Sequence, residues 1–316
     1  MVRWRAHCQI HAGQRGLGEV QVGARKEPTA RQVRLAHVLR DMREEAGHGS
    51  LEAVARELGW SKAKLSRIET GWSGVSEPDL LTLLDRYKID NRSWRSHLCE
   101  VRRRTASRDG WEVRLRSTVS AQYADYVGLE QDAAELYNAE PVLLPGLLQT
   151  YDYAATVLSQ HMPGLTEAQR DARLLIRERR QTVLTRAEPL VFWGIISESV
   201  LRHVIGGPDV MAAQLDHVLK ACEQNPSINL QVLPEKHPLH AALIQPFVIL
   251  QFPVRWEPDV VFLDGLTRNR ILEDVHDVQE YSRVFRRLNS EAPSAPESLE
   301  LIEKHRNHYQ QGVVAQ

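Results

Sequence analysis

SLEAVARELGWSKAKLSRIETG, residues 50–71, contains two short helical patterns separated by a glycine. Ser50 precedes the first pattern as a helix-capping residue, and Gly59 ends it because glycine adopts positive φ at little cost. The second pattern covers residues 61–70 and stops at Gly71. The apolar residues of both patterns share one side of each helix: Leu51, Val54, Ala55, Leu58, Leu65 and Ile68. The spacing predicts two consecutive amphipathic helices.

These two patterns are typical of a helix-turn-helix. Ala55 is small where the helices must cross, and Gly59 supplies the turn. The outward side of the second helix carries the predicted DNA-binding residues: Ser61, Lys62, Lys64, Ser66 and Arg67. A helix fits the major groove, where Lys and Arg donate to guanine and Ser serves bases or phosphates. Lys64 fits a base contact and a phosphate contact equally well.

Further helical patterns flank the pair on both sides. One begins at Arg31 and stops at Gly47, one starts at the capping box of Ser76, and one follows Asn91. Together they predict an all-α domain of five short helices over residues 31–108. The basic run Arg102-Arg-Arg104 fits phosphate contacts, but a solvated helix end is the favoured interpretation. A bundle that only dimerises is the competing interpretation, and the outward basic helix favours DNA.

The segment resembles the XRE family, the lambda-repressor-like or Cro/CI-type helix-turn-helix. The resemblance lies in Leu58-Gly59, in the run LSRIETG of residues 65–71, and in the upstream Leu39-Arg-Asp-Met-Arg43. It implies a double-stranded DNA partner, a homodimer, and a structural ion pair between Arg43 and Glu69. The family often has Gln at the position of Leu51, where it touches a phosphate. Leu51 cannot make that contact.

Charge is distributed unevenly along the 316 residues. The whole chain has a formal net charge of −1, yet residues 1–116 have a net charge of +8 and residues 117–316 one of −9. A basic N-terminal part favours a polyanionic partner such as DNA. The three cysteines, Cys8, Cys99 and Cys222, are far apart. We therefore expect no disulfide framework, no membrane partner and a cytoplasmic location.

Residues 117–310 mix the two periodicities, whereas residues 1–30 show none and are expected to be a disordered extension. Helices are predicted over 120–137, 150–159, 166–185, 208–223, 273–288 and 295–308. Strands are predicted over 190–196, 228–233, 247–252 and 260–263. Because the strands do not alternate regularly with helices, we expect an α+β domain with a small antiparallel or mixed sheet.

The second half also resembles a known domain. Residues 141–154, PVLLPGLLQTYDYA, together with shorter runs such as Arg179-Arg-Gln181 and Gln231-Val-Leu-Pro234, are similar to a C-terminal domain of unknown function in actinobacterial XRE regulators. Members of that group are described as antitoxin-like. The resemblance implies dimerisation and a small partner protein encoded by a neighbouring gene.

An enzyme is the remaining class to consider. Acidic residues gather along one stretch of the sequence: Asp259, Asp264, Glu273, Asp274 and Asp277. No hydrolase, zinc-protease or phosphate-loop motif accompanies them. We expect no catalytic residue, no metal and no cofactor, and interpret the stretch as a solvated acidic face. A ligand-responsive regulator stays open as an alternative, and a hydrolase anchored to DNA is the less favoured one.

Overall fold

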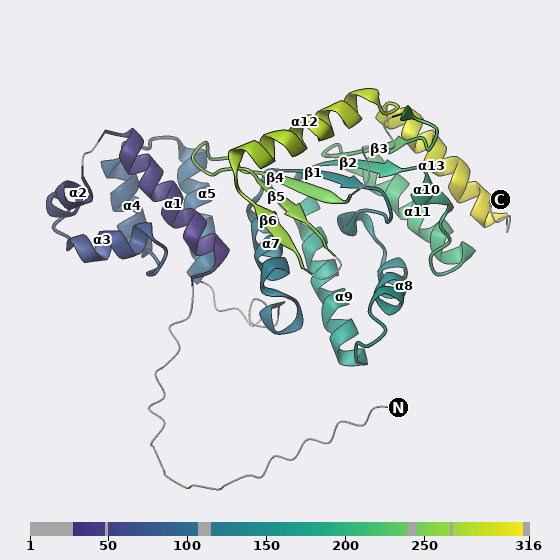
Figure 1. Ribbon diagram of the computed structural model, residues 1–316, viewed down its shortest axis with the longest axis horizontal. Coiled ribbons are helices and arrows are strands. Elements are labelled where there is room, and N and C mark those ends of the chain that lie inside the picture. The colour runs from purple at the N-terminus through teal and green to yellow at the C-terminus, as the bar shows by residue number, and fades with distance from the viewer. Residues whose placement is uncertain (1–27, 48–49, 107–114, 239–244, 266–267, 312–316) are drawn as a thin grey trace, which may run out of the picture.

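The computed structural model describes residues 28–47, 50–106, 115–238, 245–265 and 268–311. Figure 1 shows a helical N-terminal unit packed beside a larger unit of helices and strands. The predicted extension over residues 1–30 falls almost wholly outside the described residues. Within the described part, no helix is both long and apolar enough to cross a membrane.

The N-terminal unit is helical, as predicted. Its helices are α1 (Ala30–Glu45), α2 (Leu51–Glu57), α3 (Lys62–Glu69), α4 (Glu77–Arg86) and α5 (Arg92–Ala106). A hydroxyl side chain caps each of the first four by accepting a backbone N–H from the first turn: Thr29, Ser50, Ser61 and Ser76. These caps satisfy donors that the helix leaves unpaired. The apolar faces then meet in one core.

The C-terminal unit is built on a six-stranded mixed sheet with the order β3-β2-β1-β4-β5-β6. Its strands are β1 (Glu135–Glu140), β2 (Val191–Ser197), β3 (Ile228–Leu233), β4 (Phe247–Gln251), β5 (Val260–Leu263) and β6 (Arg270–Leu272). β1, β2 and β3 are parallel, and β4, β5 and β6 extend the sheet in antiparallel pairs. The α+β class is confirmed, and the sheet is larger than the small one predicted.

Helices cover both faces of this sheet (Figure 1). They are α7 (Ala121–Asp132), α8 (Tyr151–His161), α9 (Glu167–Gln181), α10 (Ser199–Arg202), α11 (Pro208–Gln224), α12 (Val275–Glu291) and α13 (Ala295–Gln310). α12 packs on one face, where Phe285 and Leu288 meet Ala139 of β1. α7, α9 and α11 lie on the other, where Leu136 of β1 joins their core. Successive β1 side chains thus serve opposite layers.

The helix predicted through residue 137 is wrong at its C-terminal end. α7 stops at Asp132, and residues 135–140 form β1 instead. This strand pairs with β2 on one side and β4 on the other, so its backbone is hydrogen-bonded along both edges. The sequence ELYNAE has polar residues where a central strand usually has β-branched ones, and long-range pairing outweighs that local preference. The short β6 was also missed.

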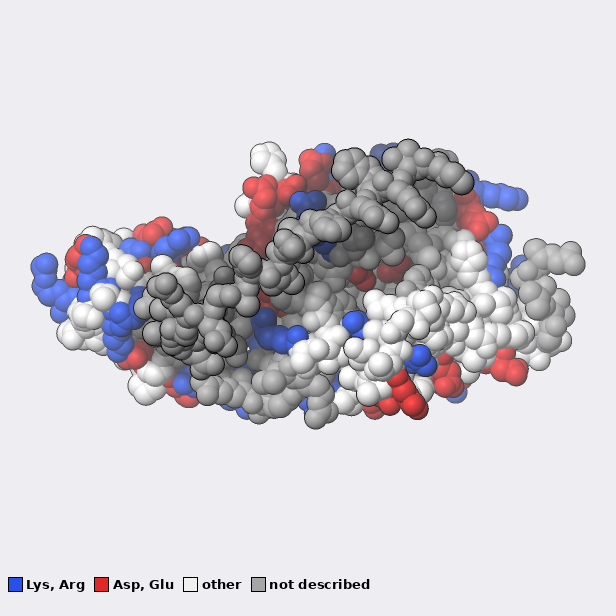
Figure 2. All heavy atoms as spheres, turned by 60° about the horizontal axis from the view of Figure 1, so that its bottom comes forward, with Lys and Arg blue, Asp and Glu red and all other residues white. Residues whose placement is uncertain are grey.

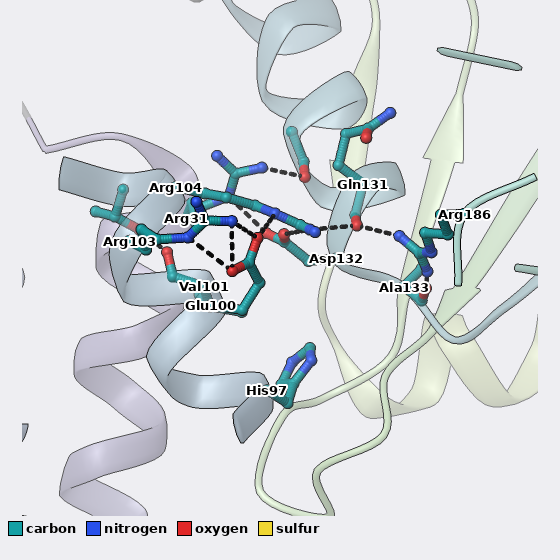
Figure 3. A network of polar contacts seen from close by, with 12 residues as sticks. Arg31, His97, Glu100, Val101, Arg103, Arg104, Gln131, Asp132, Ala133 and Arg186 are labelled. Atoms are coloured by element: carbon teal, nitrogen blue, oxygen red, sulfur yellow. Dashed lines mark hydrogen bonds and ion pairs between the residues drawn. The ribbon is translucent and has the colours of Figure 1, made fainter. Parts of the chain in front are cut away.

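The two units are joined by a buried carboxylate at the end of α7 (Figure 3). The side chain of Asp132 is 1% exposed and accepts from the Nε of Arg31, on α1, and from the Nη1 of Arg104, on α5, at 2.7 Å. Arg31 also donates to the carbonyl of Gly128, at 2.6 Å. Arg186 caps the same helix end through the carbonyls of residues 131 and 133. Cations at a helix C-terminus are favoured by its dipole.

A second junction comes from the connection between β4 and β5. Val254, in this connection, is fully buried in the core of the helical unit. Nearby, Arg34 of α1 donates to Glu273 at 3.0 Å and to the carbonyl of Pro258, and its guanidinium lies 4.3 Å from the Phe252 ring centroid. The helical unit is therefore held to the sheet by both apolar and ionic contacts.

Candidate nucleic-acid interface

α2 and α3 form the helix-turn-helix. Gly59 has a φ of +67° between them, and the N–H of Trp60 donates to the carbonyl of Ala55 at 2.8 Å. Ala55 is 1% exposed, which fits its predicted place at the helix crossing. Leu65 and Ile68 are buried beneath α3. The outward side of α3 is thus fixed by packing from below.

The C-terminal end of α3 is held directly against α1. Gly71 has a φ of +75°, and a Cβ at this position would lie 3.2 Å from the Cα of Val33. Arg43 and Glu69 form a two-pronged ion pair, with Nε–Oε1 at 2.8 Å and Nη2–Oε2 at 2.9 Å, and both residues are buried. This is the pair that the resemblance implies. It ties the recognition helix to the first helix of the unit.

The predicted DNA-binding residues divide into three groups. Ser61 caps α3 by accepting from the N–H of Lys64 at 3.1 Å, and Ser66 is half-buried. Lys62 pairs with Glu52, and Lys64 pairs with Asp79 at 2.8 Å. Arg67 is exposed, and among the described residues its side chain has no hydrogen bond or ion pair.

The two lysines are therefore engaged by carboxylates of their own unit. The Lys62–Glu52 pair is exposed and screened by solvent, so a phosphate can replace the carboxylate at small cost. Lys64 is held more firmly, because its ammonium also lies 3.8 Å from the Trp60 ring centroid. Figure 2 shows basic side chains over the end of the molecule that α2 and α3 form.

Sequence reasoning missed three residues at this surface. Glu52 pairs with Lys62, and Asp79 pairs with Lys64. Trp72 is 57% exposed immediately after α3, where a large aromatic in a polar turn was a usable signal. The exposed ring adds an apolar group beside the recognition helix.

The basic run at the end of α5 turns partly toward the protein, while the side chain of Arg103 is 73% exposed. Arg102 donates to the carbonyl of Val75, and Arg103 and Arg104 both pair with Glu100. Arg104 also reaches Asp132 of the other unit. The interpretation of this run as a solvated helix end is therefore wrong for Arg104, because a buried carboxylate attracts its guanidinium.

The acidic stretch is divided among separate partners. Asp259 accepts from Gln251, Glu273 pairs with Arg34, and Asp274 caps α12. Asp264 lines a cavity on the opposite side of the sheet from α12, and burial raises its pKa. Of the residues that the structure describes, no group of three or more His, Cys, Asp or Glu is placed to hold a metal ion.

Each of the two units matches a known protein-family model. Residues 123–304, more than half of the chain, match the family described as a domain of unknown function, DUF5753. The chain belongs to the DUF5753 family. Residues 34–98 match a helix-turn-helix domain, which supports a DNA-binding regulator and precedes the DUF5753 domain here. No curated protein and no solved structure matches the chain.

The two glycines of the helix-turn-helix give a matched test of its packing. Gly59→Ala meets no atom within 4 Å and costs about 1–2 kcal/mol from the positive φ alone. Gly71→Ala carries the same cost and also pushes a Cβ against the α1 backbone, for a total of about 2–5 kcal/mol. Urea unfolding of both variants checks the order. Equal midpoints would remove the close approach of Gly71 to α1 as a constraint.

The buried ion pair gives a second test. Arg43→Met leaves the carboxylate of Glu69 buried without its guanidinium, and the free energy of unfolding should fall by about 3–5 kcal/mol. The double variant Arg43→Met with Glu69→Leu removes both charges and should regain most of that loss. Denaturant midpoints of the single and double variants measure the difference. A double variant no more stable than the single one would contradict this account.

Proposed function

We propose that this protein is a sequence-specific transcriptional regulator that binds double-stranded DNA through the outward side of α3. The observation that carries the proposal is the exposed guanidinium of Arg67, which has no ion pair among the described residues. It lies on a helix fixed by Leu65, Gly71 and the Arg43–Glu69 pair. A rigid helix with a free arginine suits bidentate recognition of guanine in the major groove. The helix-turn-helix match supports the same assignment.

The lysines would act mainly on the backbone in this arrangement. Lys62 can exchange Glu52 for a phosphate, while Lys64 is held by Asp79 and the Trp60 ring. Phosphate contacts position a protein on DNA, and base contacts select the sequence. We therefore assign Arg67 to base recognition and Lys62 to phosphate binding, with Ser61 and Ser66 as short-range polar contacts.

The proposal extends to a homodimer in the cytoplasm, since helix-turn-helix regulators commonly bind two-fold operators. An antitoxin-like role and a small partner protein rest on the resemblance alone and stay predictions. The alternative of a ligand-responsive regulator has a structural observation in its favour, namely a cavity lined by Arg173 and Arg177 in the C-terminal unit.

Arg67 provides the direct test. Duplexes selected by the protein from random DNA give the operator, and fluorescence anisotropy measures the dissociation constant. Arg67→Ala should weaken operator binding by about 1–3 kcal/mol and relax the preference at one base pair. Arg283→Ala, which removes an exposed arginine from α12, is the matched control and should leave affinity unchanged. Unchanged affinity of folded Arg67→Ala would refute the assigned recognition helix.

The assignment of Lys62 to phosphate binding predicts a change in the salt dependence of DNA binding. Lys62→Ala should weaken binding to all duplexes alike and reduce the slope of log affinity against log salt by about one. The measurement is anisotropy over a salt series with the operator and with an unrelated duplex. A loss confined to the operator would reassign Lys62 to base recognition.

The dimer predicts an operator with two-fold symmetry. Half-sites should lie one helical turn apart, about 34 Å, because paired recognition helices enter successive major grooves on one side of the duplex. Footprinting on the selected duplexes measures the spacing. A single asymmetric protected site would contradict the dimer and leave the recognition helix in place.

A further inference from the structure

A cavity of about 380 Å³ opens on the helical face of the sheet that α7 and α9 cover. Its walls come from α7, from α9, from the C-terminal ends of β1 and β5, and from the start of β4. Small-molecule sites have volumes of roughly 300–1,000 Å³ and usually combine apolar walls with a few polar groups. The size alone makes the cavity a candidate, and the polar groups decide its ligand.

Three arginines of α9 line this cavity. Arg173, Arg177 and Arg180 are four and three residues apart, which places them on one side of the helix. Arg180 is satisfied: it donates to Glu130 at 2.8 and 2.7 Å and to the hydroxyl of Tyr123 at 2.6 Å. Its charge is thus compensated within the protein.

The other two arginines have no such carboxylate. Arg177 donates to the neutral side-chain amide of Gln149, and burial lowers the pKa of its guanidinium. The Nε of Arg173 is buried and has no hydrogen-bond partner among the described residues. Neither side chain forms an ion pair within the described part of the chain. Both side chains are partly buried, and a partly buried guanidinium without a compensating carboxylate favours an anion from outside.

Two carboxyl groups also line the cavity. Burial raises the pKa of Glu140 to about 7, and Glu140 accepts from the backbone of Val142 and Leu143. Burial raises the pKa of Asp264 as well. Neither carboxyl is within ion-pair distance of Arg173 or Arg177 in the described structure. A further arginine, Arg268, also lines the cavity, so apart from the Arg180–Glu130 pair the lining holds three arginines against these two carboxyl groups.

One part of the remaining wall is apolar, beside polar residues such as Asn138 and Asn269. The rings of Tyr126 and Phe262 stack with centroids 3.9 Å apart, and the ring of Tyr123 meets Phe262 edge-on at 6.2 Å. Leu143 and Ile176 complete this side. Such a wall suits a flat apolar or aromatic body.

We propose that this cavity binds a small organic anion, whose oxyanion group pairs with Arg173 and Arg177 and whose apolar body lies against Tyr123 and Phe262. The occupant is an effector of DNA binding, a role that rests on the proposed function. The link to DNA is α7. Tyr123, on this helix, lines the cavity. Asp132, the last residue of the helix, accepts hydrogen bonds from Arg31 and Arg104 of the helix-turn-helix unit (Figure 3).

The site can be tested without knowing the natural ligand. The probe is 8-anilinonaphthalene-1-sulfonate, an aromatic oxyanion whose fluorescence rises on binding, with neutral N-phenyl-1-naphthylamine as its uncharged counterpart. We expect one saturable site for the anion, lost or weakened about tenfold in Arg173→Gln and Arg177→Gln. Arg179→Gln, on the exposed side of the same helix, is the matched control. Displacement by benzoate or by inorganic phosphate tells carboxylate from phosphate ligands.

Three results would overturn the site: no binding of the sulfonate to the full chain, equal binding in both cavity variants, or equal binding of the neutral counterpart. Circular dichroism of each variant shows that its fold is intact. Because this assay contains no DNA, its outcome is independent of the proposed function.

The effector role needs a second measurement. The displacing anion should change operator affinity at least fivefold at constant ionic strength. Asp132→Asn should still bind the sulfonate and lose this change in operator affinity. Asp125→Asn, also on α7, removes a surface pair with Arg116 and should keep the change. Sulfonate binding with no change in operator affinity would overturn the effector role alone. Failure to select any duplex would overturn the proposed function and leave the anion site standing.

Discussion

The carboxylate of Asp132 is the contact on which the relation between the two units depends. It is buried, and it accepts from arginines of both α1 and α5. Breaking a buried pair by removing one partner leaves an uncompensated charge, so the three groups must stay together. α1 in turn positions α3 through the Arg43–Glu69 pair and the close approach of Gly71. The orientation of the recognition helix is thereby linked to the C-terminal end of α7.

This arrangement changes the meaning of the uneven charge along the sequence. The excess of basic residues before residue 117 favours a polyanionic partner when the sequence is considered alone. In the structure, three of these basic residues form ion pairs with acidic residues of the other unit: Arg31, Arg34 and Arg104. Part of the asymmetry therefore reflects attraction between the two halves. On α3, Arg67 stays exposed and has no ion pair among the described residues.

The helical unit could be predicted because its signals are local. Capping hydroxyls such as Ser50 and Ser61, and stops such as Gly71, act within a few residues of the helices they delimit. β1 could not, because residues 135–140 become a strand only by pairing with partners far along the chain. The same holds for the candidate site: its five outward residues followed from periodicity, while the partners of the two lysines depend on tertiary packing.

α7 has two roles that follow from one geometry. Its N-terminal half supplies Tyr123 and Tyr126 to the cavity wall, and both hydroxyls accept from Arg180 on α9. Its C-terminal end supplies Asp132 to the junction. A twelve-residue helix is a stiff element about 18 Å long. A shift of its N-terminal half therefore also moves its C-terminal end. An anion that draws Arg173 and Arg177 toward itself would shift α9 and, with it, Arg180, which donates to both tyrosine hydroxyls. α7 would then transmit that shift to the helices that hold α3.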